Sequence, residues 1–574
     1  MTQLTEWAQL DQSEWDESIR RVLIQMAECR ILERIWAHDH TIWKCEDTEI
    51  SNRLGWLHIA QQMSEEVLRL WPLAETVRDD GYTHALLLGM GGSSLAPEVF
   101  RKTFGVGKGA LDLAVLDSTV PGAVLAQAER LDLSRTLFIV STKSGSTVET
   151  LSFFKYFYNR VAEAVGADRA GAHFIAITDP GTSLVDLAER YRFRSTFLSE
   201  PTIGGRYSAL SYFGLVPAAL VGADVPLLLE RASCAARSCE PGVAPPGMTL
   251  CVRLGVIMAA MAKAGRDKVT FVLSPTIASF GDWVEQLIAE STGKEGTGIL
   301  PVVGESLAAP AAYTGNDRLF VYLRLDGDST HDEAVRTLED AGHPVVDLNL
   351  QDAYDLGGQC FLWEMATAVA GHLLGINPFD QPNVEAAKAL ARQMVAEYQA
   401  RGTLPDEAPT VTGNGIAVYA PPTTMAEPAA DSPEKALAAL LDQAQPGDYL
   451  ALQAYVQATA ATDAALQLLR TRLRDRSKLA TTLGYGPRFL HSTGQLHKGD
   501  AGNGLFIQIT ADDARDAPIP DEAGKPEASI TFGVLKMAQA MGDRQALLDA
   551  GRRVIRFHLQ DVATGLQYLA DSLV

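Results

Sequence analysis

The segment Ser-Thr-Lys-Ser-Gly-Ser-Thr-Val-Glu-Thr, residues 141–150, separates two stretches of different hydrophobic periodicity. Residues 136–140 (TLFIV) are apolar and rich in β-forming residues, which predicts a buried strand. Residues 151–158 (LSFFKYFY) repeat apolar side chains at helical spacing. The segment is therefore predicted to be a loop that leaves a strand and opens a helix.

This loop has the chemistry of a phosphate site. Its first seven residues carry five hydroxyl side chains, the amine of Lys143, and Gly145, which lets a ligand approach the backbone. Backbone N–H groups at a helix N-terminus favour an anion, and the three terminal oxygens of a phosphate monoester need several donors. The alternative is an ordinary helix start capped by Ser or Thr.

Composition limits the classes of partner. The chain has 574 residues, enough for roughly three or four domains. Its net charge of −22 argues against nucleic acids and anionic membranes as partners. A phosphate site in such an acidic protein needs local positive charge, which Lys143 and Arg206 could supply.

Cysteine usage and the N-terminus indicate a cytoplasmic protein. The six cysteines show no framework spacing, and Cys234 and Cys239 are interpreted as free loop thiols. The acidic N-terminal segment has no apolar core, so no signal peptide is predicted. No apolar run approaches 18 residues, so no membrane span is expected.

Strand and helix patterns alternate from residue 84 onward, which predicts parallel α/β units. The predicted divisions are an N-terminal helical segment (1–80), a first unit (81–240), a second unit (245–400), a linker (401–434) and a C-terminal unit (435–574). Strands are expected at 86–88, 113–116, 138–140, 174–177 and 194–198, then at 268–274, 318–324 and 344–350, and finally at 449–455 and 504–510.

The first predicted strand runs into Gly89–Pro97 (GMGGSSLAP), and Asp117 ends the next strand. This pattern is typical of the start of a dinucleotide fingerprint, but Ser94 stands at the third glycine position. A nicotinamide oxidoreductase would also leave the hydroxyl-rich loop unexplained. Sugar-phosphate binding is therefore favoured. Arg206 follows another strand within 201–211 (PTIGGRYSALS), either held against a ligand or exposed at a glycine turn.

Residues 279–294 (SFGDWVEQLIAESTGK) predict a helix ending near Gly293. Trp283, Leu287 and Glu290 share one face, so the carboxylate follows the apolar stripe and suits a general base, unless it is a surface residue of the last turn. Gln381 and Lys388 lie seven residues apart and could share a face of a helix that begins at Pro382, reaching either a ligand or solvent.

Two histidines, His491 and His497, lie in a glycine-rich segment of the C-terminal unit. No third ligand is near them, so no metal site is predicted.

Taken together, these motifs resemble the glucose-6-phosphate isomerase family. The matching stretches occur in the family's order at Gly89–Pro97, Thr142–Thr150, Gly204–Arg206, Glu290–Lys294 and Phe379–Lys388. The terminal segments are most similar to the isomerase half of bifunctional transaldolase/glucose-6-phosphate isomerases. The resemblance implies two sugar-isomerase (SIS) domains of flavodoxin-like architecture beside the C-terminal α/β unit. It also implies a site between the two domains, a homodimer, and no metal or organic cofactor.

The resemblance also implies roles for individual residues. Thr142, Lys143, Ser144 and Thr147 would hold the phosphate. Gly92, Ser93 and Gly205 would line the substrate, and Gln381 and Lys388 would contact it. Arg206 would stabilise an enediolate for which Glu290 is the base. These roles imply interconversion of glucose 6-phosphate and fructose 6-phosphate. Alternatives are a non-catalytic SIS regulator and an isomerase that also accepts mannose 6-phosphate.

One family feature is missing. The family has a ring-opening histidine after the base, but residues 295–324 contain none. We expect His491 of the C-terminal unit to replace it, because imidazole exchanges protons near neutral pH. His491 is preferred to His497 because residues 487–490 resemble a strand end aimed at a site. His343 is a competitor within the second unit, and the remaining alternative is Lys388 with water.

Overall fold

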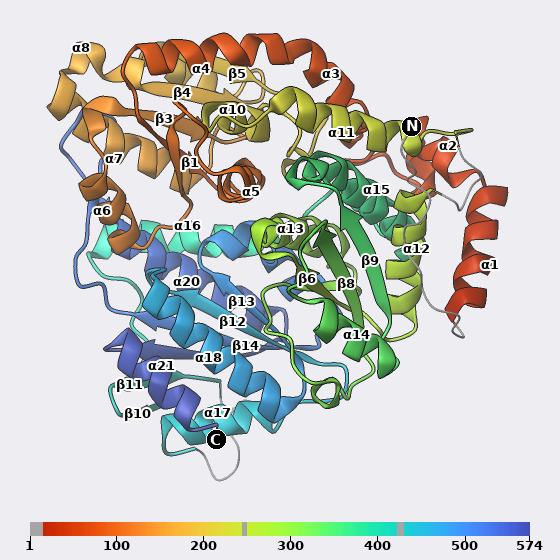
Figure 1. Cartoon of the computed structure of the whole chain (residues 1–574). Coiled ribbons are helices and arrows are strands. Elements are labelled where there is room, and N and C mark those ends of the chain that lie inside the picture. The colour runs from red at the N-terminus through yellow and green to blue at the C-terminus, as the bar shows by residue number, and fades with distance from the viewer. Residues whose placement is uncertain (1–14, 244–248, 422–429, 574) are drawn as a thin grey trace.

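The computed structural model describes residues 15–243, 249–421 and 430–573. Residues 1–14 of the predicted N-terminal segment, the predicted boundary at 245, and residues 422–429 of the predicted linker lie outside the described residues. Three sheet-containing units surround the centre of the molecule. Figure 1 shows the first unit at the upper left, the second at the right, and the C-terminal unit below in blue.

The first sheet is parallel, with strand order β2-β1-β3-β4-β5. Its strands are β1 (His84–Gly89), β2 (Asp112–Leu116), β3 (Thr136–Ser141), β4 (Phe174–Thr178) and β5 (Ser195–Leu198). Every residue of β3 is buried because helices cover both faces, which is why its sequence is nearly continuously apolar. This is the flavodoxin-like order, and the predicted fold class is confirmed.

The second sheet repeats that order with four parallel strands, β7-β6-β8-β9. They are β6 (Lys268–Leu273), β7 (Leu300–Val302), β8 (Arg318–Leu325) and β9 (Val345–Leu350). The sequence predicted β6, β8 and β9 and missed β7, which is only three residues long.

The C-terminal sheet has the order β10-β11-β17-β14-β12-β13. Its strands are β10 (Val411–Gly413), β11 (Ile416–Tyr419), β12 (Tyr449–Tyr455), β13 (Ala480–Tyr485), β14 (Gly504–Ala511) and β17 (Arg553–Leu559), with the small hairpin β15 (Pro518–Ile519) and β16 (Ile530–Thr531) outside it. Its four parallel strands again follow the order of the first sheet. β10 and β11 come from the predicted linker and pair antiparallel onto this sheet.

Helices connect and cover the strands. Those before the second sheet are α1 (Trp15–Glu28), α2 (Ile31–Trp36), α3 (Ile59–Glu66), α4 (Leu70–Asp79), α5 (Leu95–Phe104), α6 (Pro121–Arg130), α7 (Val148–Val165), α8 (Ala167–Ala170), α9 (Ser183–Arg190), α10 (Tyr212–Leu220), α11 (Val225–Ser238) and α12 (Leu250–Lys263). The later ones are α13 (Phe280–Thr292), α14 (Asp332–Asp340), α15 (Leu356–Leu374), α16 (Val384–Arg401), α17 (Pro433–Leu441), α18 (Ala460–Ser477), α19 (Gly494–Gly499), α20 (Phe532–Asp549) and α21 (Val562–Asp571).

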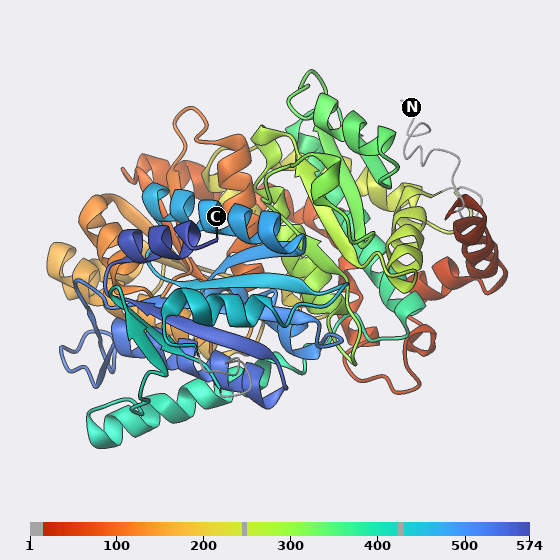
Figure 2. The same ribbon diagram turned by 90° about the horizontal axis from the view of Figure 1, so that it is seen from below.

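The C-terminal unit packs directly on the other two. Phe532 of α20 stacks on Phe153 of α7, with ring centroids 5.8 Å apart, inside a shared hydrophobic cluster. α16 lies along α20, between the first unit and the C-terminal unit (Figure 1). The view from below shows the blue C-terminal unit in front of the first unit on the left, with the green second unit beside it on the right (Figure 2). The C-terminal unit is therefore an integral layer of the fold.

Three details differ from the sequence-based expectations. Cys239 and Cys251 form a disulfide, so the interpretation of Cys239 as a free thiol was wrong, and Cys234 lies on α11 rather than in a loop. Residues 487–490 do not form a strand end, because the 3-10 helix η13 (Arg488–His491) follows β13. α16 begins at Val384, so Gln381 precedes the helix. Within the described ranges, no helix is both long and apolar enough for a membrane span.

Candidate active site

The hydroxyl-rich loop connects β3 to α7, as predicted. Thr147 is the N-cap residue of α7, but its side chain makes no capping hydrogen bond. Its hydroxyl lies 2.8 Å from the Thr142 hydroxyl, and the two are hydrogen-bonded. Ser144 is exposed, and its oxygen accepts from the Ser146 hydroxyl at 3.2 Å. The loop hydroxyls thus pair with one another and leave the helix N-terminus open to an anion.

Lys143 has a carboxylate partner. Its Nζ donates to Asp179 Oδ2 at 2.5 Å and lies 3.4 Å from the carbonyl of Glu200. Burial lowers the pKa of Lys143, an effect that Asp179 opposes, and burial raises the pKa of Asp179. Lys143 therefore lies in the loop and forms an ion pair with Asp179.

Backbone contact joins the two glycine motifs. Gly91, Gly92 and Ser93 form the 3-10 helix η5 after β1, and all three are buried. A Cβ atom at Gly92 would lie 2.0 Å from the carbonyl oxygen of Gly205, so only glycine permits this approach. Gly205 begins the 3-10 helix η8 (Gly205–Tyr207), which carries Arg206. The glycine loop η5 and the element that carries Arg206 are thus packed directly against each other.

Arg206 is only 2% exposed, so the alternative of a surface arginine at a glycine turn was wrong. Its Nε donates to Ser291 Oγ at 2.8 Å, and its Nη1 donates to Gln381 Oε1 at 2.9 Å. Its Nη2 donates to the carbonyls of Pro378 and Asp380 at 2.7 and 2.9 Å. The guanidinium is fixed in one orientation.

Glu290 lies on the buried face of α13, together with Trp283 and Leu287. It is 9% exposed, so the alternative of a surface glutamate was also wrong. Its Oε1 lies 3.6 Å from Nη1 of Arg206, and its Oε2 accepts from Gln286 Nε2 at 3.1 Å. One carboxylate oxygen therefore faces the guanidinium while the other is held in place by an amide.

The turn before α16 is held from two sides. Lys294 Nζ donates to the backbone carbonyl and to Oδ1 of Asp380 at 2.6 and 2.7 Å. The same Asp380 carbonyl accepts from Arg206. The hydrogen bonds from Lys294 and Arg206 together fix the turn that places Gln381 next to the guanidinium.

His491 reaches the first unit from the C-terminal unit. Its Nε2 donates to Oε1 of Glu149, on α7, at 2.9 Å, and its backbone carbonyl accepts from Gln286 Nε2 at 2.8 Å. A Cβ at Gly91 would lie 2.8 Å from that carbonyl, so His491 borders the glycine loop. Burial raises the pKa of Glu149, but the charges of His491 and Lys388 oppose this more strongly, so the pKa lies below its usual value. Glu149 is thus an ionised partner for the imidazole.

Lys388 lies on the outer side of this pair. It occupies α16, donates to Glu385 Oε1 at 2.9 Å, and its side chain is 34% exposed. Its charge acts on Glu149. Lys388 is thus near the His491–Glu149 pair and partly open to solvent.

The other two histidines lie in hydrophobic surroundings. His497 is 3% exposed among the rings of Tyr449, Phe489 and Phe506, and burial holds its pKa well below the usual value. His343 packs against Tyr313 and Phe320, in a cluster separate from the site.

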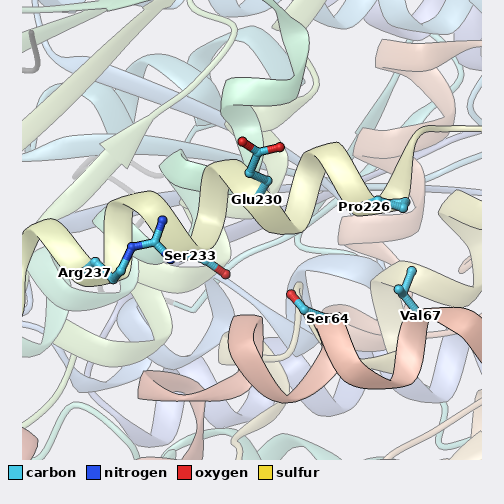
Figure 3. Close-up of a pocket in the computed structure, with 6 residues that line it drawn as sticks. All are labelled: Ser64, Val67, Pro226, Glu230, Ser233 and Arg237. Atoms are coloured by element: carbon cyan, nitrogen blue, oxygen red, sulfur yellow. The ribbon is translucent and has the colours of Figure 1, made fainter. Parts of the chain in front are cut away.

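A cavity of about 280 Å³ lies elsewhere, between α3 and α11. Figure 3 shows the Ser64 and Ser233 hydroxyls facing each other across it, while the Glu230 carboxylate points away from α3. None of the predicted site residues line it, so it is distinct from the candidate active site.

Sequence reasoning missed four residues of the site. Gln286 precedes Glu290 by one helical turn, so its position on the buried face was a usable signal. Glu149 is the second-last residue of the hydroxyl-rich segment itself. Ser291, which accepts from Arg206, and Gln539, which donates to Glu149 Oε1 at 2.7 Å, carried no local signal because their partners are distant in sequence.

Comparison with known proteins gives consistent matches. The family model described as phosphoglucose isomerase matches residues 73–297. Glucose-6-phosphate isomerase of Rubrobacter xylanophilus is 30% identical over 370 residues, which cover 55% of this chain and 84% of that protein. An enzyme of the same name from Thermus thermophilus is 28% identical over 398 residues, covering 61% and 91%.

Solved structures agree on the fold. A hypothetical protein of Thermus thermophilus superposes with a TM-score of 0.58 at 25% identity, covering 68% of this chain and all of that one. A glucose-6-phosphate isomerase of Chlamydia trachomatis gives a TM-score of 0.56 at 19% identity, covering 67% and 88%. The C-terminal unit lies beyond the segment that the family model matches.

Proposed function

Since this chain belongs to the phosphoglucose isomerase family, we propose that it interconverts glucose 6-phosphate and fructose 6-phosphate through a cis-enediolate. The observation that carries the proposal is the buried pair of Glu290 and Arg206, with carboxylate and guanidinium 3.6 Å apart. A base next to a fixed positive charge suits proton abstraction beside a carbonyl, because the charge offsets the oxyanion that develops. The substrate class follows from the family and from the hydroxyl-rich loop.

The loop between β3 and α7 would bind the phosphate. Its hydroxyls, with Thr142 and Thr147 2.8 Å apart, can turn from each other toward phosphate oxygens. The open N-terminus of α7 adds backbone donors. The sugar would then extend past Ser93 and Gly205 toward Arg206.

His491 would open the ring. Ring opening moves a proton from the C1 hydroxyl to the ring oxygen, and an imidazole can accept the first and supply the second. Glu149 orients the imidazole through the 2.9 Å hydrogen bond. Lys388, whose charge acts on the same carboxylate, would assist at the ring oxygen.

Glu290 would then transfer the proton. Its carboxylate removes the C2 proton of the open-chain aldose, the C2 electron pair forms the C1–C2 double bond, and the carbonyl electrons move to the C1 oxygen. Arg206 offsets the resulting negative oxygen. The proton of the C2 hydroxyl passes to the C1 oxygen, the same carboxyl group returns its proton to C1, and the C2 oxygen becomes the carbonyl of the ketose. Gln286 holds the other carboxylate oxygen throughout.

The test separates ring opening from isomerisation. Ring opening and reclosure alone interconvert the two anomers of glucose 6-phosphate, and exchange NMR measures that rate. Glu290→Gln should lose isomerisation by about 10²–10⁴-fold or more and keep anomer exchange. Retained exchange of the C2 proton with deuterium in this variant would contradict the assignment of the base.

His491→Asn is the matched variant for the other step. It should lose catalysed anomer exchange while still binding the substrate, because Asn removes the titratable ring and leaves the phosphate loop intact. Near-wild-type anomer exchange in His491→Asn would exclude this residue from ring opening. The homodimer implied by the resemblance stays a prediction, and light scattering after size exclusion tests it.

A further inference from the structure

We propose that Gln539 of the C-terminal unit is a positioning residue that holds Glu149 in line with His491 during ring opening, an inference that rests on the proposed function. Gln539 lies on α20 and is 4% exposed. Its role would be to fix the carboxylate that in turn fixes the imidazole.

The geometry forms a continuous chain of hydrogen bonds. Thr119, in the loop after β2, donates its hydroxyl proton to Gln539 Oε1 at 2.8 Å. This contact directs the amide nitrogen of Gln539 to Glu149, whose Oε1 accepts from Nε2 at 2.7 Å. The same Glu149 oxygen accepts from His491 at 2.9 Å. Three separate elements therefore define where that oxygen lies.

Because this chain of hydrogen bonds is buried, its polar atoms depend on one another for partners. Thr119 is fully buried, and Glu149 is 4% exposed. Where bulk water has so little access, an amide donor and an imidazole donor together satisfy the charge on Glu149 Oε1. If the amide were lost, the carboxylate could rotate about its last bond and take His491 with it.

The charged and titratable groups around Glu149 determine how its pKa should change when Gln539 is replaced. His491 on η13 and Lys388 on α16 lower the pKa of Glu149, and burial opposes them. The buried Tyr455 of β12 also faces it. A hydrogen bond to the ionised form stabilises that form. Removing the Gln539 donor should therefore raise the pKa of Glu149.

The variant is Gln539→Met, which keeps the length and removes both hydrogen bonds. The matched control is Gln508→Met. Gln508 is a fully buried glutamine of the same unit that donates to the carbonyl of Ala540 at 3.0 Å and does not contact Glu149. Loss of an outer hydrogen-bond partner of a functional histidine at a metal site typically costs about 10–100-fold. We expect about a 10-fold fall in kcat for anomer exchange in Gln539→Met, with KM unchanged, because the Gln539 amide is buried and already bonded to Thr119 and Glu149.

The second readout needs no turnover. Carboxyl ¹³C NMR of the protein labelled at Glu follows Glu149, which is assigned by the resonance lost in Glu149→Gln. The pKa of Glu149 should rise in Gln539→Met, should rise less in Thr119→Val, which only frees the amide to turn, and should stay unchanged in Gln508→Met. If the variants show these shifts but the wild-type protein does not isomerise fructose 6-phosphate, the proposed function is refuted and the positioning of Glu149 by Gln539 stands.

Unchanged exchange and an unchanged pKa of Glu149 would contradict the proposal. If Gln539→Met and Gln508→Met lose the same amount of thermal stability and both keep the wild-type exchange rate and Glu149 pKa, Gln539 is only part of the packing. Should Gln539→Met fail to fold, Thr119→Val decides alone, and an unchanged Glu149 pKa in that variant overturns the proposal.

Discussion

Lys294 should make activity and stability respond to pH in opposite directions. Burial, together with the neighbouring charge of Arg206, lowers the pKa of Lys294 to about 8, although Asp380 and Glu290 oppose this. Above pH 8 the amine loses its charge, and its bonds to Asp380 weaken. The turn that presents Gln381 should loosen, and a charge-assisted bond reduced to a neutral one costs about 1 kcal/mol, or about 5-fold in kcat.

The free energy of unfolding should rise with pH, whereas kcat should fall. The unfolded lysine, with a pKa near 10.5, binds its proton more tightly than the folded one, so the unfolded state carries more protons between pH 8 and 10.5. The contribution of Lys294 to the free energy of unfolding is therefore fully present above pH 10.5 and is lost as pH falls through 8. The difference of about 2.5 pKa units corresponds to about 3 kcal/mol.

The assay compares three proteins between pH 7 and 10.5. Urea unfolding of the wild type minus that of Lys294→Met isolates the contribution of this lysine, and initial rates of fructose 6-phosphate isomerisation give kcat. Lys294→Arg stays charged and should keep its activity above pH 8. The reasoning fails if the stability difference is flat or falls with rising pH, or if Lys294→Arg loses kcat at the same pH as the wild type.

Three further outcomes follow from the site and its surroundings. Thr147→Ala and Lys143→Ala should raise KM about 10-fold with little change in kcat, since the phosphate is held alike in the ground and transition states; an unchanged KM, or no competition by millimolar phosphate, would contradict the phosphate site. His497→Asn should lower the melting temperature without changing the pH profile of kcat, and His343→Asn should leave kcat within about 2-fold of the wild type. A selective loss of anomer exchange in either variant would assign ring opening to that histidine instead of His491. Cys239→Ala should lower the free energy of unfolding by about 2–3 kcal/mol, because it opens a loop closed over a sequence separation of 12; urea curves that match the oxidised wild type would show that the disulfide adds nothing.

The sequence was sufficient for several of the strands that are buried on both faces. The predictions at β1, β3 and β12 succeeded because a strand covered on both sides must be apolar throughout. It failed for β7, which is too short for a periodic signal. It also missed β13 and β17, and in β17 the residues Arg553, Arg556 and His558 interrupt the apolar run. It also failed at α16, where Pro382 suggested a helix start two residues too early.

The site was predictable only in part, for a physical reason. Motifs that lie within one loop, such as the one carrying Thr142 and Thr147, show their chemistry locally. The contact between Glu149 and His491 joins residues 342 positions apart, and Gln539 lies a further 48 residues along the chain. Such contacts depend on how the three units dock, and a local pattern holds no information about docking.

The distance along the chain between Glu149 and His491 has a consequence for biosynthesis. The ribosome makes the loop after β3 early and His491 342 residues later. At about 5–20 residues per second, the delay is roughly 20–70 seconds. During that time Glu149 has neither its imidazole nor its amide partner, and the first two sheets can fold around an incomplete site. A nascent chain therefore lacks the imidazole of the proposed ring-opening step until its C-terminal unit has been translated and has docked on the first unit.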